Sequence, residues 1–192
     1  TIIISFIGGD GIGPYIAEEA QKVLEVLLAD ELQSGKVEFR YIKDLTIEKR
    51  VEVNKPIPGD VLENIKQCHI TLKGPTTTPR KGDRWPNIES ANVALRKKLD
   101  LFANIRPIKV KKDNIDWTFF RENTEDLYAG KEIEIAKGIM QSMKIITRTA
   151  SDRIAKYAFR YASRNSRKKI TVFHKANIMK LTDGLFLQCA RL

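Results

Sequence analysis

The chain opens with a strand-like run that a glycine-rich turn follows at once. Residues 2–7 read IIISFI, and these β-branched and apolar side chains suit a strand buried on both faces. GGDGIGP follows at residues 8–14, and its proline suits the first position of a helix. An apolar stripe at helical spacing then consists of Ile16, Ala20, Val23, Leu24 and Leu27. A buried strand, a tight turn and a helix in this order predict an α/β fold.

Further strands and helices follow the same alternation. VEFRYI at residues 37–42 predicts a second strand, and the two prolines and mixed charges of residues 46–58 predict a loop. Residues 59–68 have helical spacing, and HITLK at residues 69–73 predicts a third strand, in which His69 has a structural role. GPTTTP comes next and places hydroxyl groups, Thr78 among them, where open α/β sheets bind ligands. A plain turn explains this segment equally well.

Residues 89–107, ESANVALRKKLDLFANIRP, predict a helix that runs into a strand. Ser90 takes the N-cap position, and Asn92 and Arg96 lie one helical turn apart. Their neighbours Ala91, Leu95, Leu99 and Phe102 form an apolar stripe. Arg106 follows the expected strand LFANI. Because helix N-termini attract anions, the stretch predicts a place for a small polyanion, although a solvated helix face with an ordinary cap explains any one of these residues alone.

The second half of the chain offers two more polar groupings. IDWTFFRENTEDLYAG predicts a strand that ends at Arg121 and an acidic loop that reaches Tyr128, which together suit a carboxylate and acid/base site. Residues 139–149 predict a strand, and Ser151 and Asp152 predict the cap of the next helix. The strand expected at residues 170–174 is followed by Lys175, which as a bare residue reads as an exposed lysine.

Composition limits the functional classes. The chain has 42% hydrophobic and 30% charged residues, which is typical of a soluble globular protein, and no apolar run is long enough to span a membrane. The net charge of +10 suits nucleic acid, a membrane surface or a small anion, and the absence of a nucleic-acid motif disfavours the first. Cys68 and Cys189 lie far apart, which indicates neither a disulfide framework nor a metal site and favours a reducing compartment.

Four motifs together resemble the isocitrate dehydrogenases, within the family of metal-dependent β-decarboxylating 3-hydroxyacid dehydrogenases. They are GDGIGP, the helix and strand of residues 89–107, the segment of residues 115–130, and HKANIMK at residues 174–180. The resemblance covers nearly the whole chain. Ser90 and Asn92 favour isocitrate, because relatives that act on 3-isopropylmalate carry a more apolar set there.

The resemblance implies oxidative decarboxylation of isocitrate to 2-oxoglutarate, with NAD or NADP as the hydride acceptor and Mg²⁺ or Mn²⁺ to polarise the substrate hydroxyl. The implied catalytic residues are Tyr128 and Lys175, and Lys175 would act in the partner subunit's site. The implied substrate-binding residues are Ser90, Asn92, Arg96, Arg106 and Arg121. The implied cofactor-binding residues are Ile12, Thr78 and Asn177. Three guanidinium groups suit a tricarboxylate, since each can hold a carboxylate through two parallel hydrogen bonds.

The resemblance also implies an architecture. Residues 1–122 would form the first half of a large α/β domain, and residues 123–192 would begin a smaller domain that forms a homodimer or a higher oligomer. The family's metal ligands and its adenine-reading loop follow later in the chain, so we expect no metal site here and no activity from this segment alone. The loop from Arg80 to Glu89 receives no role.

Neither a signal nor a transit segment precedes Thr1, so we expect a cytoplasmic protein, or a mitochondrial matrix protein if a leader has been removed. We expect neither nucleic acid nor a membrane as a partner. The alternatives are a noncatalytic regulatory subunit of a hetero-oligomeric isocitrate dehydrogenase, and a homoisocitrate, isopropylmalate or tartrate dehydrogenase.

Overall fold

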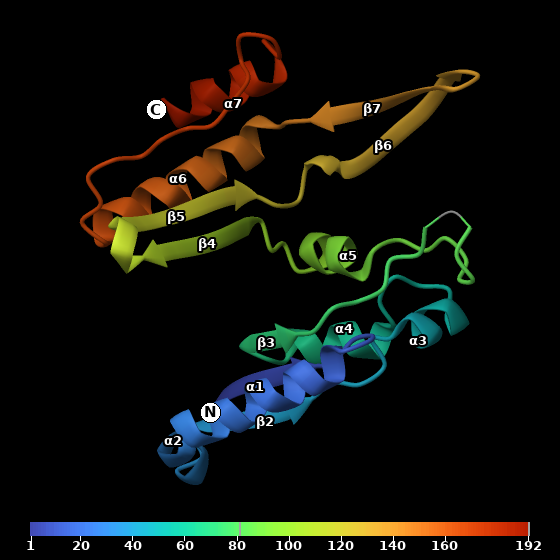
Figure 1. The fold of residues 1–192 in the computed structure, drawn as a ribbon, viewed down its shortest axis with the longest axis vertical. Coiled ribbons are helices and arrows are strands. Elements are labelled where there is room, and N and C mark those ends of the chain that lie inside the picture. Colours follow the sequence, from blue (N-terminus) through green and yellow to red (C-terminus); the bar gives the residue numbers. More distant parts are fainter. Residues whose placement is uncertain (81, 192) are drawn as a thin grey trace. The chain divides into compact units, whose positions relative to one another are not determined.

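The computed structural model describes residues 1–80 and 82–191, and the chain divides into two compact units, Thr1–Leu99 and Asp100–Leu192 (Figure 1). Both units combine strands with helices, which confirms the predicted α/β class. The predicted domain boundary at residue 122 stays a prediction.

The first unit is built on a three-stranded parallel sheet with the order β2-β1-β3. Its strands are β1 (Ile2–Ile7), β2 (Val37–Tyr41) and β3 (Ile70–Lys73), all three of which the sequence predicted. Ile4 lies opposite Phe39 on one side and Ile70 on the other. The helices are α1 (Gly13–Leu27), α2 (Ala29–Gln33), α3 (Ile47–Glu52), α4 (Gly59–Lys66) and α5 (Ala91–Lys98).

The two faces of this sheet are buried in separate clusters. Ile4 and Phe6 of β1 pack with apolar residues of α1 and α2, whereas Ile7 belongs to a cluster with residues of α4 and α5. Successive side chains of a strand point to opposite faces, so the helices cover the sheet on both sides. The expectation that β1 is buried on both faces is therefore confirmed.

The predicted apolar stripe lies on α1 and is largely exposed, since Ile16, Val23 and Leu27 keep 51%, 59% and 69% of their surface, and among its residues Leu24 packs against the sheet. One expectation for this unit was wrong. Residues 47–52 form α3 where a loop was expected, because Thr46 caps this helix by accepting a hydrogen bond from the amide of Lys49.

The second unit contains two antiparallel hairpins and two helices (Figure 1). β4 (Ala103–Val110) pairs with β5 (Ile115–Glu122) across the 3₁₀ turn η1 (Lys111–Asp113), and β6 (Asp126–Ala136) pairs with β7 (Ile139–Ile145). The helices are α6 (Arg148–Arg164) and α7 (Thr182–Ala190). Phe120 of β5 contacts Tyr157 and Tyr161 of α6, so α6 covers one face of the first hairpin.

Two expectations for the second unit were wrong, namely the start of a helix and the presence of a strand. α6 begins after Thr147, whose hydroxyl accepts from the amide of Ala150, rather than at Ser151 and Asp152. Residues 170–174 are not a strand in the described part of the chain, because a strand is defined by pairing with a neighbour and no described strand pairs with this apolar run.

The β6–β7 hairpin extends away from α6 as a two-stranded arm (Figure 1). It exposes large apolar side chains, including Ile133, Ile135, Ile139 and Met140. Within the described residues, no helix has the length and apolar character needed to cross a membrane.

Candidate functional site

Two loops meet at the carboxyl ends of β1 and β3 in the first unit. The amide of Asp10 donates to the carbonyl oxygen of Pro75 at 2.8 Å. Gly9 has a φ of +72°, and a Cβ there would lie 2.1 Å from that same oxygen. The glycine turn and GPTTTP therefore touch through their main chains, at the sheet edge where ligands bind in this fold class. The cofactor candidates Ile12 and Thr78 are both exposed at these loops.

The α5 helix carries three substrate-binding candidates. Ser90 is its N-cap residue, as predicted, but the hydroxyl makes no capping hydrogen bond. Ser90, Asn92 and Arg96 are half-buried, while Ala91 and Leu95 of the same helix are buried, so the polar residues border the packed face as expected. A cap residue that does not cap its helix leaves both its hydroxyl and the first amides to an anion.

Lys73 is a further cationic residue that Arg96 of α5 affects, and the sequence had not indicated it. It ends β3, and its ammonium donates to the carbonyl oxygen of Gly74 at 2.6 Å. Burial lowers the pKa of Lys73; the carboxylate of Asp10 opposes that shift, and the guanidinium groups of Arg50 and Arg96 add to it. A lysine at the end of a strand and directly before a turn rich in threonine was the signal available in the sequence.

In the second unit, two of the predicted arginines share a face of the β4–β5 hairpin. Arg106 lies opposite Phe119, and Arg121 lies opposite Asn104. Residues two apart along a strand point to the same side, so Arg106 and Arg121 are diagonal neighbours on one face. This is the face opposite Phe120 and therefore opposite α6. Both arginines are exposed there, ready to meet a carboxylate.

Arg121 also contacts the candidate catalytic tyrosine. Its Nη1 donates to the phenol oxygen of Tyr128 at 3.1 Å, and its Cζ lies 4.8 Å from the centre of the ring. The expectation of an acidic loop reaching Tyr128 was wrong, because Tyr128 lies inside β6. It lies between the paired residues Asp126 and Lys131, where the register of the β6–β7 ladder shifts. A cation and a phenol thus sit together at the start of the arm.

Lys175 stands on a turn between residue 174 and α7. Its carbonyl oxygen accepts from the amides of Ile178 and Met179, and its amide donates to Oδ2 of Asp183 at 2.6 Å. The side chains of Lys175 and Asn177 are exposed. The main chain at Lys175 is therefore fixed, while its ammonium projects from the turn.

Asp183 holds this turn. It is 6% exposed and also accepts from Nζ of Lys144 on β7 at 2.5 Å. Burial opposes its ionisation, but the hydrogen bonds from Lys144 and from the amide of Lys175 outweigh burial and lower the pKa of Asp183.

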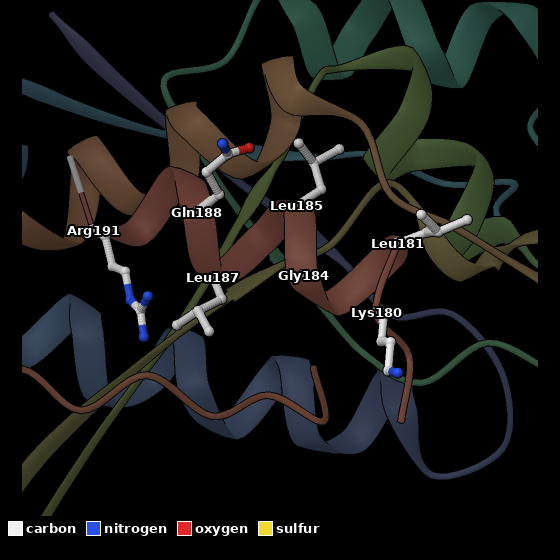
Figure 2. A pocket seen from close by; sticks show the side chains of 7 residues that line it. All are labelled: Lys180, Leu181, Gly184, Leu185, Leu187, Gln188 and Arg191. Atoms are coloured by element: carbon white, nitrogen blue, oxygen red, sulfur yellow. The ribbon is translucent and has the colours of Figure 1, made fainter. Parts of the chain in front are cut away.

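Whether the described residues form a metal centre or a hollow in the surface also bears on the site. Among the described residues, no group of three or more histidine, cysteine, aspartate or glutamate side chains is placed to hold a metal ion. A shallow hollow follows α7 and is lined by one stretch of chain (Figure 2), namely Lys180, Leu181, Gly184, Leu185, Leu187, Gln188 and Arg191. None of the candidate site residues lines it.

The fold is α/β, and the ligands of the candidate residues in each unit stay predictions. Residues 3–192 match the model of the isocitrate/isopropylmalate dehydrogenase family, and the chain belongs to that family.

The chain is 44% identical to isocitrate dehydrogenase [NAD] catalytic subunit 6, mitochondrial, of Arabidopsis thaliana over 94% of this chain and 47% of that protein. It is 42% identical to isocitrate dehydrogenase [NAD] regulatory subunit 2, mitochondrial, of the same plant, over 96% of this chain and 48% of that protein. The crystal structure of isocitrate dehydrogenase from Methylococcus capsulatus superposes with a TM-score of 0.82 and 38% identity, over all of this chain and 56% of that one. The chain thus spans about half the length of the curated relatives it matches.

Proposed function

We propose that this chain contributes to an NAD-dependent isocitrate dehydrogenase, which oxidises and decarboxylates isocitrate to 2-oxoglutarate. The observation that carries the proposal is the contact between Arg121 and Tyr128 on strands that also present Arg106. Cations that hold carboxylates beside a phenolic proton donor are the groups that a β-decarboxylation needs. The family and the NAD-dependent isocitrate dehydrogenases among the relatives support the same assignment.

The residues that we propose to bind the carboxylates of isocitrate are those that the family resemblance indicates. They are Ser90, Asn92 and Arg96 on α5, and Arg106 and Arg121 on the β4–β5 hairpin. Lys73 adds a fourth cation next to α5. Ile12 and Thr78 would lie beside the nicotinamide, and Asn177 would contact the cofactor or the substrate.

Proton transfers are assigned to Lys175 and Tyr128. Lys175 would take the proton of the C2 hydroxyl as hydride leaves C2 for the nicotinamide, which gives a ketone. The β-carboxylate then leaves as carbon dioxide, and its bonding electrons form an enolate that Tyr128 would protonate at C3. Arg121, which donates to the phenol oxygen of Tyr128, would stabilise the negative charge left on that oxygen.

The finer features stay predictions. The described residues do not form a metal-binding group, so we assign no step to Mg²⁺ or Mn²⁺ through this chain's own side chains. NADP in place of NAD and a homodimer with shared sites have no direct support. Several relatives are subunits of NAD isocitrate dehydrogenases with mitochondrial names, which favours an oligomer in the mitochondrial matrix over the cytoplasm.

A noncatalytic regulatory subunit is the second candidate, because the identity to a regulatory subunit is close to the identity to a catalytic one. Such a subunit would bind isocitrate without turning it over. The presence of Arg96, Arg106, Arg121, Tyr128 and Lys175 in this chain favours catalysis.

An NMR titration of the 192-residue chain with isocitrate tests the proposal. We expect isocitrate to shift the amide signals of α5 and those of Arg106 and Arg121 together. Arg121→Lys should weaken binding about tenfold, because lysine cannot make two parallel hydrogen bonds to a carboxylate. The matched control is Arg167→Lys, which alters a half-buried arginine that pairs with Asp116 at 2.9 Å and should leave the affinity unchanged.

Two results would contradict the proposal. One is the absence of any response at α5, Arg106 and Arg121, and the other is tighter binding of 3-isopropylmalate than of isocitrate. With NAD and magnesium or manganese added, we expect no 2-oxoglutarate from this chain alone. Measurable turnover would show that it holds a metal ion after all.

A further inference from the structure

Arg50 of α3 is a fully buried guanidinium with no carboxylate hydrogen-bonded to it. It is 0% exposed, and its three nitrogens donate to three main-chain oxygens. The acceptors are the carbonyls of Pro56 at 2.9 Å, Thr77 at 2.7 Å and Glu89 at 2.7 Å. Burial lowers the pKa of Arg50, and the charge of Asp10 partly offsets this. Burial of the Arg50 charge costs free energy, and the hydrogen bonds to three main-chain segments offset this cost.

Asp10, in the glycine turn, holds the same region from the other side. Its Oδ1 accepts from the amide of Ile47, the first residue of α3, at 2.8 Å, and its Oδ2 accepts from the amide of Thr77 at 2.6 Å. The amide of Thr77 is thus held by an anion and its carbonyl by a cation. We call this arrangement of Asp10, Arg50 and Thr77 the Thr77 clamp.

The clamp lies next to both groups of binding candidates in the first unit. Thr77 precedes Thr78 of the cofactor loop, and Glu89, whose carbonyl Arg50 also holds, precedes Ser90 at the start of α5. A single planar guanidinium therefore fixes one main-chain atom on each side of the site. An apolar side chain would fill the same volume without fixing the orientation of either peptide, and lysine lacks the fork that reaches diverging acceptors.

We propose that Arg50 and Asp10 are positioning residues. They hold the segment GPTTTP of residues 74–79, here called the Thr78 loop, and the amino-terminal end of α5 in one geometry before ligands bind. The assignment of these two segments as binding segments rests on the proposed function. Neither side chain touches a reacting atom in this proposal. Their effect is preorganisation, since a loop and a helix end that are already fixed lose less conformational freedom on binding.

Amide hydrogen exchange on the 192-residue chain, read residue by residue, tests the clamp without any ligand. In Arg50→Lys and in Asp10→Asn, we expect exchange to accelerate at least about tenfold at Thr77, whose amide donates to Asp10, and at Ala94, whose amide donates to the carbonyl oxygen of Ser90, because each variant loses hydrogen bonds to a charged group. Exchange in the strands of the sheet should change much less. Arg40→Lys is the matched control, because Arg40 is a partly exposed arginine whose bonds go to the side chains of Glu38 and Gln67.

The second measurement is the affinity of each variant for isocitrate and for NAD. Loss of positioning should weaken both ligands about tenfold at a temperature well below the unfolding midpoint of each variant, where the chain is folded. A purely structural role predicts instead that exchange accelerates by one factor throughout the first unit, and that result would overturn the proposal. Unchanged exchange at Thr77 and at the start of α5 would overturn it too.

The two proposals fail in different ways. If the unaltered chain binds neither isocitrate nor NAD, the proposed function fails, and the exchange data still decide whether the clamp orders these segments. If Arg50→Lys does not fold, Asp10→Asn decides, because an asparagine retains one acceptor for Ile47 and loses the second acceptor that Thr77 needs.

Discussion

The two units secure their candidate site residues in different ways. In the first unit the loops are fixed by close main-chain contacts and by buried charges, as at Gly9 and Arg50. In the second unit Arg106 and Arg121 lie exposed on a two-stranded hairpin. There a buried charge fixes the main chain at Lys175, whose amide donates to Asp183. The difference teaches that a side chain forced into the main-chain contacts of the first unit should chiefly lower stability, whereas changes at the exposed arginines of the second unit should chiefly change ligand binding.

The sharpest test of this contrast is Gly74→Ala. A Cβ at residue 74 would lie 2.1 Å from the carbonyl oxygen of Gly8, so two main chains must separate to make room. We expect a loss of more than about 3 kcal/mol in the free energy of unfolding, measured by urea denaturation. Gly59→Ala is the control: nothing lies within 4 Å of its Cβ, and it should stabilise α4 by about 0.5 kcal/mol. Equal effects would break the comparison.

The buried carboxylate of the second unit should give the next largest effect. Asp183→Asn removes the charge that binds Lys144, and we expect a loss of about 2 kcal/mol at neutral pH. Asp116→Asn, which alters an exposed carboxylate paired with Arg167, should cost much less.

The effect at Asp183 should depend on pH in a defined direction. Its pKa is lowered below the ordinary value of 3.8 in the folded chain, so the stabilisation is complete above that value and is lost as the pH falls through the folded pKa. Denaturation curves at neutral and at acidic pH should therefore show the wild type losing its advantage over Asp183→Asn in acid. A constant difference would mean that Asp183 stabilises by packing alone.

Two N-caps allow a finer comparison. Thr147→Ala should cost about 1 kcal/mol, because the hydroxyl caps α6. Ser90→Ala should cost less than about 0.5 kcal/mol, since that hydroxyl makes no capping bond to α5, yet it should weaken isocitrate binding. Thermal unfolding and the NMR titration report the two quantities separately. A larger stability loss at Ser90 than at Thr147 would contradict the assignment of its hydroxyl to a ligand.

The smallest effect is expected on the arm. Met140 keeps 68% of its surface, so Met140→Lys should change the free energy of unfolding by less than about 0.5 kcal/mol. Ile154→Lys serves as the contrasting variant, because Ile154 is 3% exposed on α6 and a charge there has no place in the packing. Similar denaturation midpoints for the two variants would contradict the burial difference.

Much of the fold was predictable because it follows from local patterns. β1, β2, β3 and α5 all fall where apolar periodicity and turn residues predicted them. α3 was missed because one of its two buried residues, Arg50 beside Ile47, is charged, and a hydrophobic pattern assigns a charged residue to the surface. The strand expected at residues 170–174 failed for a different reason: pairing is a non-local property, and an apolar run does not reveal whether a neighbour exists.

The candidate site was predictable in part. The contact between Arg121 and Tyr128 agrees with a sequence motif that placed an arginine and a tyrosine seven positions apart, although the loop between them proved to include strand. Lys73, Asp10 and Arg50 escaped notice, because their importance lies in hydrogen bonds to main-chain atoms of distant segments. Hydrogen bonds to the main chain leave little trace in residue identity at the acceptor.

The lowered pKa of Lys73 has a chemical consequence. A larger share of this amine is neutral at mildly alkaline pH than of Lys49, whose pKa is raised by its hydrogen bond to Glu52. Only the neutral amine is a nucleophile, so amine-directed acylating reagents should label Lys73 well before Lys49 as the pH is raised. Lys73 is also half-buried, and the charge of Arg96 on α5 acts on it. An anion bound at the start of α5 should therefore shield Lys73 from acylation.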